Sequence, residues 1–169
     1  KLGTPYYFLT RQVIYLLIGI FGAYIIYKID LEKIKKYSLF LVLANIALLA
    51  AVFIPGIGWG SGGAKRWIIL GPLQLQPTEL LKLTFIIFAA TWLTKAVESL
   101  RSKKITITNF RHLAMCCIVF VVITVILKKQ PDISSFAVLF SIFSIMLFVS
   151  GIQLRYFLGI ATLGLTILI

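Results

Sequence analysis

Six long apolar segments, separated by short polar stretches, constrain the fold of this chain more than any other feature. They span residues 6–27, 37–54, 77–94, 112–127, 133–152 and 154–169. A helix that crosses a membrane needs about 20 apolar residues, so we expect the shorter segments to extend into flanking polar residues. A closed β-barrel would need alternating polar and apolar positions, and the run from Cys117 to Ile123 does not alternate. The sequence therefore predicts an all-α, polytopic membrane protein with about six transmembrane helices.

The composition supports a membrane location and argues against a nucleic-acid partner. Hydrophobic residues make up 60% of the chain, charged residues make up 13%, and the mean hydropathy is +1.03. A soluble domain of 169 residues would need many more polar side chains to cover its surface. The net charge of +12 would suggest nucleic acid in a soluble protein, but here the basic residues lie in short clusters between apolar runs. We therefore expect membrane lipids, and no nucleic acid, among the partners.

Residues 1–169 form a single predicted transmembrane domain. The chain begins at Lys1 without an initiator Met, and its first apolar run lacks the small-residue cleavage site of a signal peptide. We therefore expect the sequence to be an internal piece of a longer, multi-pass membrane protein.

The distribution of Lys and Arg predicts how the helices are oriented. Ten basic residues lie on one side of the predicted helices, six lie on the other, and Lys82 lies inside a helix. The cytoplasmic side of a membrane protein usually carries the excess of basic residues. The larger group comprises Lys28, Lys33, Lys35, Lys36, Lys95, Arg101, Lys103, Lys104, Arg111 and Arg155. The loop 55–75 and the turn 128–132 are therefore predicted to face outward.

The densest polar motif begins in this outward loop and ends inside the next helix. It includes Arg66 and Trp67, then Gln76-Pro77-Thr78-Glu79-Leu80-Leu81-Lys82, and the next residues are almost wholly apolar. Ionisable side chains at the edge of a membrane are costly and usually belong to a site. A purely structural interpretation is equally well supported, because Pro77 suits the first position of a helix and Glu79 complements the helix dipole. Glu79 and Lys82, three residues apart, can both neutralise each other and line a groove.

Arg66 and Trp67 suggest contact with a lipid-linked headgroup. The planar fork of an Arg suits a diphosphate, and Trp prefers the membrane interface where such a headgroup lies. Contact with anionic lipid explains Arg66 more simply, and an interfacial anchor explains Trp67 more simply.

A second polar motif, Gln130-Pro131-Asp132, follows two lysines on the outward side. Asp132 can complement the dipole at the start of the next helix. An outward carboxylate beside two lysines can also hold a loop or help to retain a divalent cation. We do not assign Asp132 as a catalytic base.

Together these motifs resemble those of the SEDS (FtsW/RodA/SpoVE) family of peptidoglycan glycosyltransferases. The family pattern runs roughly Asn-Gly-Ala-x-Arg-Trp-Ile, Leu-Gly-Pro, Gln-Pro-Ser-Glu-x-x-Lys and later Gln-Pro-Asp-Leu-Gly-Thr. This chain departs from it at Gly62, where the family has Asn, and at Ile133-Ser134-Ser135, where the family has Leu-Gly-Thr. The resemblance covers essentially all 169 residues, as roughly helices two to seven of a fold with about ten. It implies a substrate groove lined by Arg66, Trp67, Gln76, Glu79, Lys82, Gln130 and Asp132.

The resemblance also implies an activity for the full-length protein. Family members polymerise lipid II, an undecaprenyl-diphosphate-linked disaccharide peptide, into glycan strands during cell elongation, division or sporulation. They work in the bacterial cytoplasmic (inner) membrane beside a class B penicillin-binding protein. The family's proposed catalytic Asp lies in a later outward loop, which we expect beyond Ile169, so we expect this chain to be inactive alone. No cofactor is evident and Cys116-Cys117 match no metal-ligand spacing, while a divalent cation in the full-length protein stays open.

Two other functions remain open on the sequence. A flippase or transporter of lipid-linked precursors would use the same charged groove, but it should carry polar residues at the midplane in paired, interrupted helices. A non-catalytic scaffold of the cell-wall synthesis complex would not need a charge at the depth of Lys82. The density of the outward motifs favours the glycosyltransferase.

Overall fold

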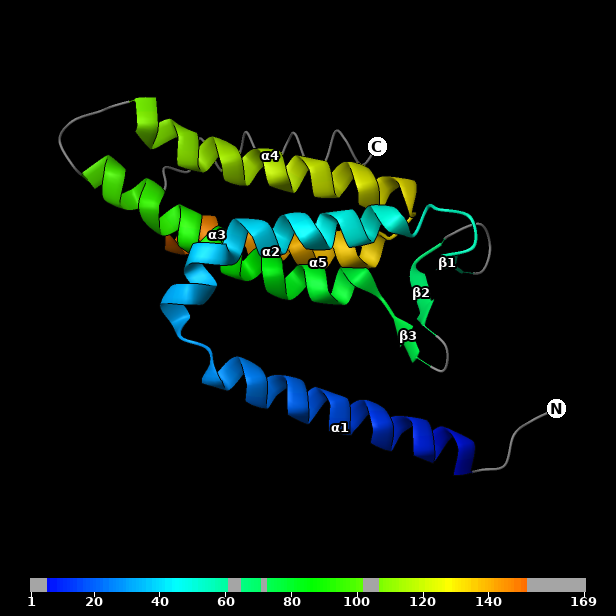
Figure 1. Cartoon of the computed structure of the whole chain (residues 1–169). Helices are drawn as coiled ribbons and strands as arrows, with labels where there is room; N and C mark the ends of the chain where they lie inside the picture. The colour runs from blue at the N-terminus through cyan, green and yellow to red at the C-terminus, as the bar shows by residue number, and fades with distance from the viewer. Residues whose placement is uncertain (1–5, 61–64, 71–72, 102–106, 152–169) are drawn as a thin grey trace. The chain divides into compact units, whose positions relative to one another are not determined.

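The computed structural model describes residues 6–60, 65–70, 73–101 and 107–151. Within these ranges the chain forms five helices and three short strands (Figure 1). In chain order they are α1 (Tyr6–Lys28), α2 (Leu31–Ala51), β1 (Gly58–Trp59), β2 (Trp67–Leu70), β3 (Leu73–Leu75), α3 (Pro77–Arg101), α4 (Ile107–Lys129) and α5 (Ile133–Val149). The chain divides into two compact units, Lys1–Lys36 and Tyr37–Ile169, with the boundary inside α2.

The first five predicted segments are helical. Among the described residues, α1, α2, α3 and α4 are each long and apolar enough to cross a membrane, and α5 is a shorter apolar helix of 17 residues. α2, α3 and α4 extend beyond the apolar segments into polar residues, as the sequence predicted. The sixth predicted segment, 154–169, lies outside the described residues.

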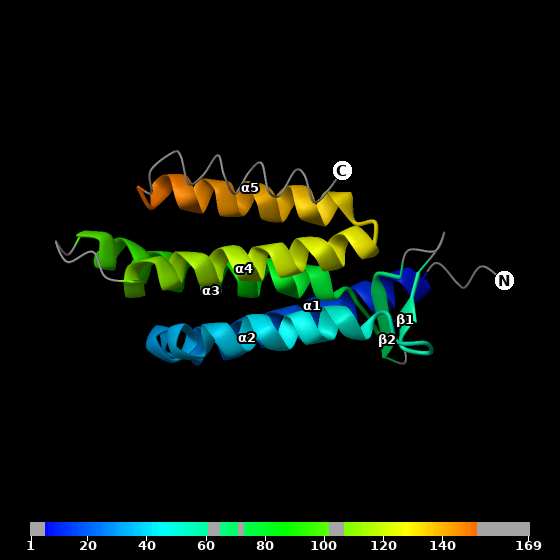
Figure 2. The same cartoon turned by 90° about the horizontal axis from the view of Figure 1, so that it is seen from above.

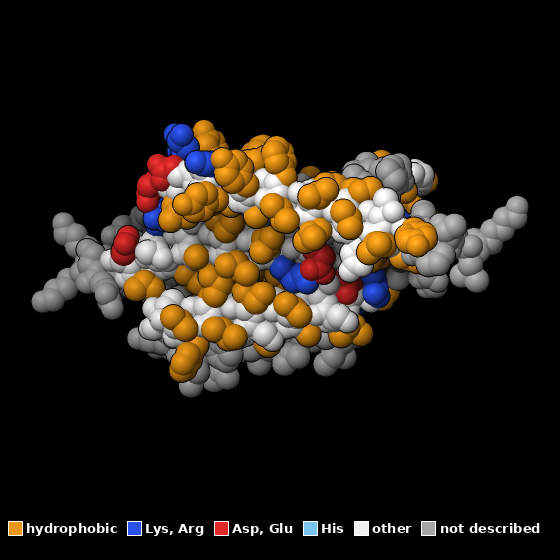
Figure 3. All heavy atoms as spheres, turned by 90° about the horizontal axis from the view of Figure 1, so that it is seen from below, with side chains coloured by type: hydrophobic (Ala, Val, Ile, Leu, Met, Phe, Trp, Pro, Cys, Tyr) orange, Lys and Arg blue, Asp and Glu red, His pale blue; other side chains and the backbone are white. Residues whose placement is uncertain are grey.

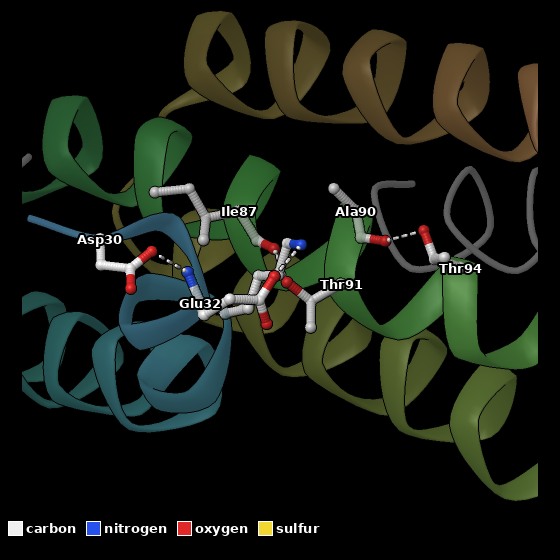
Figure 4. A network of polar contacts seen from close by, with 7 residues as sticks. Asp30, Glu32, Ile87, Ala90, Thr91 and Thr94 are labelled. Atoms are coloured by element: carbon white, nitrogen blue, oxygen red, sulfur yellow. Dashed lines mark hydrogen bonds and ion pairs between the residues drawn. The ribbon is translucent and has the colours of Figure 1, made fainter.

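Asp30 starts α2 in the first unit. Its carboxylate accepts a hydrogen bond from the backbone N–H of Glu32 at 3.2 Å (Figure 4), and its carbonyl accepts from Lys33 and Ile34 at 3.0 and 3.2 Å. These bonds satisfy N–H groups that a helix start otherwise leaves without partners. One turn later Lys35 and Glu32 form an ion pair of 2.7 Å. Polar residues between two apolar segments therefore define this helix start.

Two threonine hydroxyls inside α3 are satisfied by carbonyls of their own helix. The hydroxyl of Thr91 donates to the carbonyl of Ile87, and that of Thr94 donates to Ala90, each at 2.8 Å (Figure 4). A lipid environment offers no water to such groups, so an internal acceptor is needed. These bonds let a largely apolar membrane helix contain threonine.

The core of the second unit is a cluster of aromatic rings from three helices. α3, α4 and α5 contact one another, and Figure 2 shows them running side by side. Phe85, Phe120 and Phe143, one from each helix, are fully buried, with ring centroids 4.8 to 5.9 Å apart. α2 adds Val42 and Leu49 to the same core. Since lipid is as apolar as these side chains, close packing is what favours this association.

Side chains that point away from the core of the bundle are also apolar. Leu83 of α3 is 60% exposed, Ile118 of α4 is 57% exposed and Ile145 of α5 is 62% exposed. In Figure 3 most coloured side chains are hydrophobic, and the charged ones form a few small groups. Helices that are apolar both inside and outside are typical of membrane-spanning segments.

The predicted outward loop contains strands that the sequence analysis did not anticipate. β1, β2 and β3 form an antiparallel sheet in that order, with Gly58 opposite Ile68 and Ile68 opposite Leu75. The aromatic and β-branched residues Trp67 to Ile69 favour a strand. Gly58 is required where β1 passes the end of α2, because a Cβ there would lie 1.7 Å from the carbonyl oxygen of Val52.

Candidate functional site at the outward end of the bundle

Two long-range hydrogen-bond contacts bring the predicted outward motifs together at one end of the second unit. The guanidinium of Arg66, next to β2, donates to backbone carbonyls of the α4–α5 turn. The side chain of Gln130 in that turn donates to the carbonyl of Leu49, near the end of α2. The sheet, the end of α2 and the α4–α5 turn therefore form one surface, which we call the outer site.

Arg66 connects the sheet to the α4–α5 turn. Its Nε donates to the carbonyl of Gln130 at 3.3 Å, and its Nη2 donates to the carbonyl of Pro131. The backbone N–H of Arg66 also donates to Trp59 of β1 at 3.2 Å. The fork that could hold a diphosphate thus directs two of its five N–H donors at the backbone.

Gln130 is a buried amide that links the turn to α2. Its side chain is 1% exposed, and Nε2 donates to the carbonyl of Leu49 at 3.2 Å. Its Oε1 is buried and has no hydrogen-bond partner among the described residues. A buried amide of this kind favours one arrangement of the two elements, because separating them would cost a hydrogen bond.

Asp132 starts α5 and is 3% exposed. Its Oδ1 accepts from the backbone N–H of Ser135 at 3.2 Å, and its carbonyl accepts from Phe136 at 3.1 Å. The helix start that the sequence predicted at Asp132 is therefore present, and the Asp132 side chain caps it. Its second oxygen, Oδ2, is buried and has no hydrogen-bond partner within the described ranges. Asp132 also lines a cavity of about 230 Å³, together with Leu127, Lys128, Pro131, Ile133 and Phe136.

Glu79 and Lys82 form the predicted ion pair on the first turns of α3. Their charged atoms are 2.8 Å apart, and the side chains are 60% and 23% exposed respectively. Neighbouring Leu81 and Phe85 are fully buried, so the pair lies beside the core. Among the described residues, no hydrogen bond or ion pair joins it to Asp132.

Trp67 lies in β2 of the sheet, and Gln76 lies directly after β3. Trp67 opposes Trp59 across β1 and β2 and is half-buried. Gln76 is half-buried and directly precedes Pro77, the first residue of α3, and its carbonyl accepts from the N–H of Glu79 at 3.1 Å. Trp67 therefore lies within the segment 55–75, and Gln76 lies between that segment and the start of α3.

A buried polar contact between α2 and α3 was missed by the sequence analysis. Asn45 of α2 is 6% exposed, and its Nδ2 donates to the hydroxyl of Thr84 in α3 at 3.2 Å. Its Oδ1 is buried without a partner among the residues described. Asn45 is the sole amide in the segment 37–54, and a polar residue in such a run could have flagged the contact. In the part of the chain that the structure describes, no group of three or more His, Cys, Asp or Glu side chains could hold a metal ion.

Comparisons with known proteins agree with this architecture. The family model of FtsW, RodA and SpoVE, described as Cell cycle protein, matches residues 1–169. Among similar proteins, the probable peptidoglycan glycosyltransferase FtsW of Nitrosococcus halophilus is 35% identical over 97% of this chain and 41% of its own length. The one of Haemophilus influenzae is 37% identical over 95% of this chain and 39% of its own.

Solved structures show the same fold. The rod shape determining protein RodA of Thermus thermophilus matches with a TM-score of 0.72 and 30% identity, over 98% of this chain and 52% of that one. A chain from a peptidoglycan synthase complex, described for its coordination of polymerization and crosslinking, matches with a TM-score of 0.70 and 28% identity, over 94% and 44%. This chain therefore spans about half or less of the proteins that it matches.

The apolar helices and these matches define an integral membrane protein. The chain belongs to the FtsW/RodA/SpoVE family, the SEDS family that its motifs resembled.

Proposed function

We propose that the full protein to which this chain belongs is a peptidoglycan glycosyltransferase of the bacterial inner membrane, which polymerises lipid II into glycan strands. The observation that carries the proposal is the match of 95 to 97% of the chain to relatives named as probable enzymes of this activity. The collection of its motif residues at one end of the bundle supports it. A lipid-linked sugar would present its headgroup at a membrane surface, which is where such a site can bind it.

In this proposal the outer site, together with the Glu79–Lys82 pair on the first turns of α3, holds and orients the substrate. The ammonium of Lys82, next to apolar surroundings, would balance negative charge on the lipid-linked diphosphate as it leaves. The Oδ2 of Asp132, which has no hydrogen-bond partner among the described residues, would accept a hydrogen bond from a donor supplied by the substrate or by the rest of the protein. The base that activates the attacking sugar hydroxyl would lie in the rest of the full protein, in a region that corresponds to the part of the relatives outside the match.

A class B penicillin-binding protein is the proposed partner. The similarity to a chain from a peptidoglycan synthase complex supports this, because that complex is described as coordinating polymerization with crosslinking. The partner would crosslink the strands that this protein extends.

Purified protein in lipid vesicles can test the proposal. We expect the full-length protein, with its partner, to convert lipid II into glycan strands that are visible on a gel. The 169-residue chain should yield no product at the same molar amount. Movement of lipid II across the vesicle membrane without polymerisation would contradict the proposal in favour of a flippase, and glycan made by this chain would show that the base lies within it.

A further inference from the structure

Arg66 adds two hydrogen bonds to the α4–α5 turn, whose own backbone bonds come from the N–H groups of Gln130 and Asp132. Pro131 has no backbone N–H, so the turn cannot use a donor at that position. The carbonyls of Gln130 and Pro131 follow the end of α4, where a helix leaves its last acceptors without internal partners. Arg66, which lies 64 residues earlier in the chain than Gln130, supplies donors to both carbonyls. A cation at this place also complements the negative end of the α4 dipole.

The α4–α5 turn that Arg66 bonds to positions two buried polar side chains of the outer site. Gln130 points from it to the end of α2, and Asp132 follows it at the start of α5. The N–H of Asp132 donates back to Leu127 of α4 at 3.1 Å, which closes the turn. The position of the Asp132 carboxylate is thus tied to the position of two carbonyls that Arg66 holds.

We propose that Arg66 is a positioning residue: its guanidinium fixes the α4–α5 turn against the sheet, and this holds the buried Asp132 carboxylate in place at the start of α5, beside the cavity that Asp132 lines. This inference rests on the proposed function and deepens it. It assigns to Arg66 a task directed at the protein backbone, in place of a direct bond to the diphosphate of the substrate. Mutation of Arg66 should then impair the reaction after the substrate has bound.

The neighbouring lysine provides a matched control. Lys65 carries the same charge in the same loop and is exposed. Attraction of an anionic headgroup would draw on both residues, whereas only Arg66 donates to Gln130 and Pro131. Arg66→Lys keeps the charge but lacks the planar fork that bonds two acceptors at once. Charge and geometry can therefore be tested separately.

The experiment uses the full-length protein with its partner, in lipid, as the unaltered form and as the variants Arg66→Ala, Arg66→Lys and Lys65→Ala. The first measurement is hydrogen exchange at the backbone N–H of Ser135, which is bonded to Asp132. Asp132→Ala, which removes that acceptor, defines the exchange rate of an open cap. The second measurement is the rate of glycan synthesis as a function of lipid II concentration, which separates kcat from KM.

We expect both Arg66 variants to speed exchange at Ser135 toward the Asp132→Ala rate, and to lower kcat by about ten- to a hundredfold with KM changed less than about twofold. Lys65→Ala should change neither quantity. Unchanged exchange in Arg66→Ala would overturn the proposal, as would a raised KM with an unaltered kcat, which would mark Arg66 as a direct substrate ligand. If the unaltered protein makes no glycan, the proposed function fails. The exchange measurement still tests whether Arg66 fixes the α4–α5 turn.

Discussion

At the scale of single residues, the ion pair of α3 has two roles to separate, a contribution to folding stability and a proposed contribution to the reaction. Glu79 is mostly exposed and Lys82 is 23% exposed, so their attraction contributes at most about 1 kcal/mol to folding. We therefore predict that Lys82→Ala in the full-length protein leaves the unfolding temperature nearly unchanged. Glycan synthesis should fall by about a hundredfold, because a cation at the site of charge development is lost. A polymerisation assay beside a thermal melt measures both.

Lys35→Ala is the control for this change. Lys35 and Glu32 form an ion pair with the same three-residue spacing, 2.7 Å between charged atoms, on another helix. It is absent from the motifs that define the outer site, so its loss should leave glycan synthesis unaltered. Equal losses in the two variants, or full activity in Lys82→Ala, would remove the chemical role of Lys82.

At the scale of elements, the sequence predicted the helices well and the outward loop poorly. Helix positions follow from apolar runs that only a helix can carry across a membrane. The strands depend on contacts that no local pattern encodes, such as the close passage of Gly58 beside Val52. The motif residues of the outer site were identified one by one, but the bonds from Arg66 to the α4–α5 turn join residues 64 and 65 positions apart. Such pairings can be identified only from the folded structure, because many basic side chains in the sequence could have donated hydrogen bonds to that turn.

The packing of α3, α4 and α5 gives a prediction at the same scale. Phe120 contacts the rings of both Phe85 and Phe143, so Phe120→Ala would leave a cavity among three helices. We expect a loss of about 3 kcal/mol in unfolding free energy, measured by thermal or denaturant unfolding of the purified protein. Ile118→Ala on the same helix, at a side chain that is 57% exposed, should cost less than about 0.5 kcal/mol. Similar losses in both variants would show that the aromatic cluster is not the core of the bundle.

At the scale of the whole molecule, orientation decides whether the outer site can meet an outward-facing substrate. The end of α2, the sheet, and the α4–α5 turn lie at one end of the second unit, while α3 and α4 are joined at the other (Figure 1). The sequence between α3 and α4 contains Lys103 and Lys104 and is flanked by further basic residues. The positive-inside rule then assigns the α3–α4 connection to the cytoplasm and the outer site to the opposite face.

Cysteine labelling can check this orientation in intact cells. Ser61→Cys, in the predicted outward loop, should react with a membrane-impermeant maleimide added from outside. Ser102→Cys, in the predicted cytoplasmic loop, should react only after the membrane is permeabilised. Both variants are made with Cys116→Ala and Cys117→Ala, so that the chain carries one reactive thiol, and the parent without Ser61→Cys or Ser102→Cys should stay unlabelled. The reverse pattern would place Arg66, Lys82 and Asp132 at the cytoplasmic face, where they could not act on a substrate presented outside, and the proposed function would fail with it.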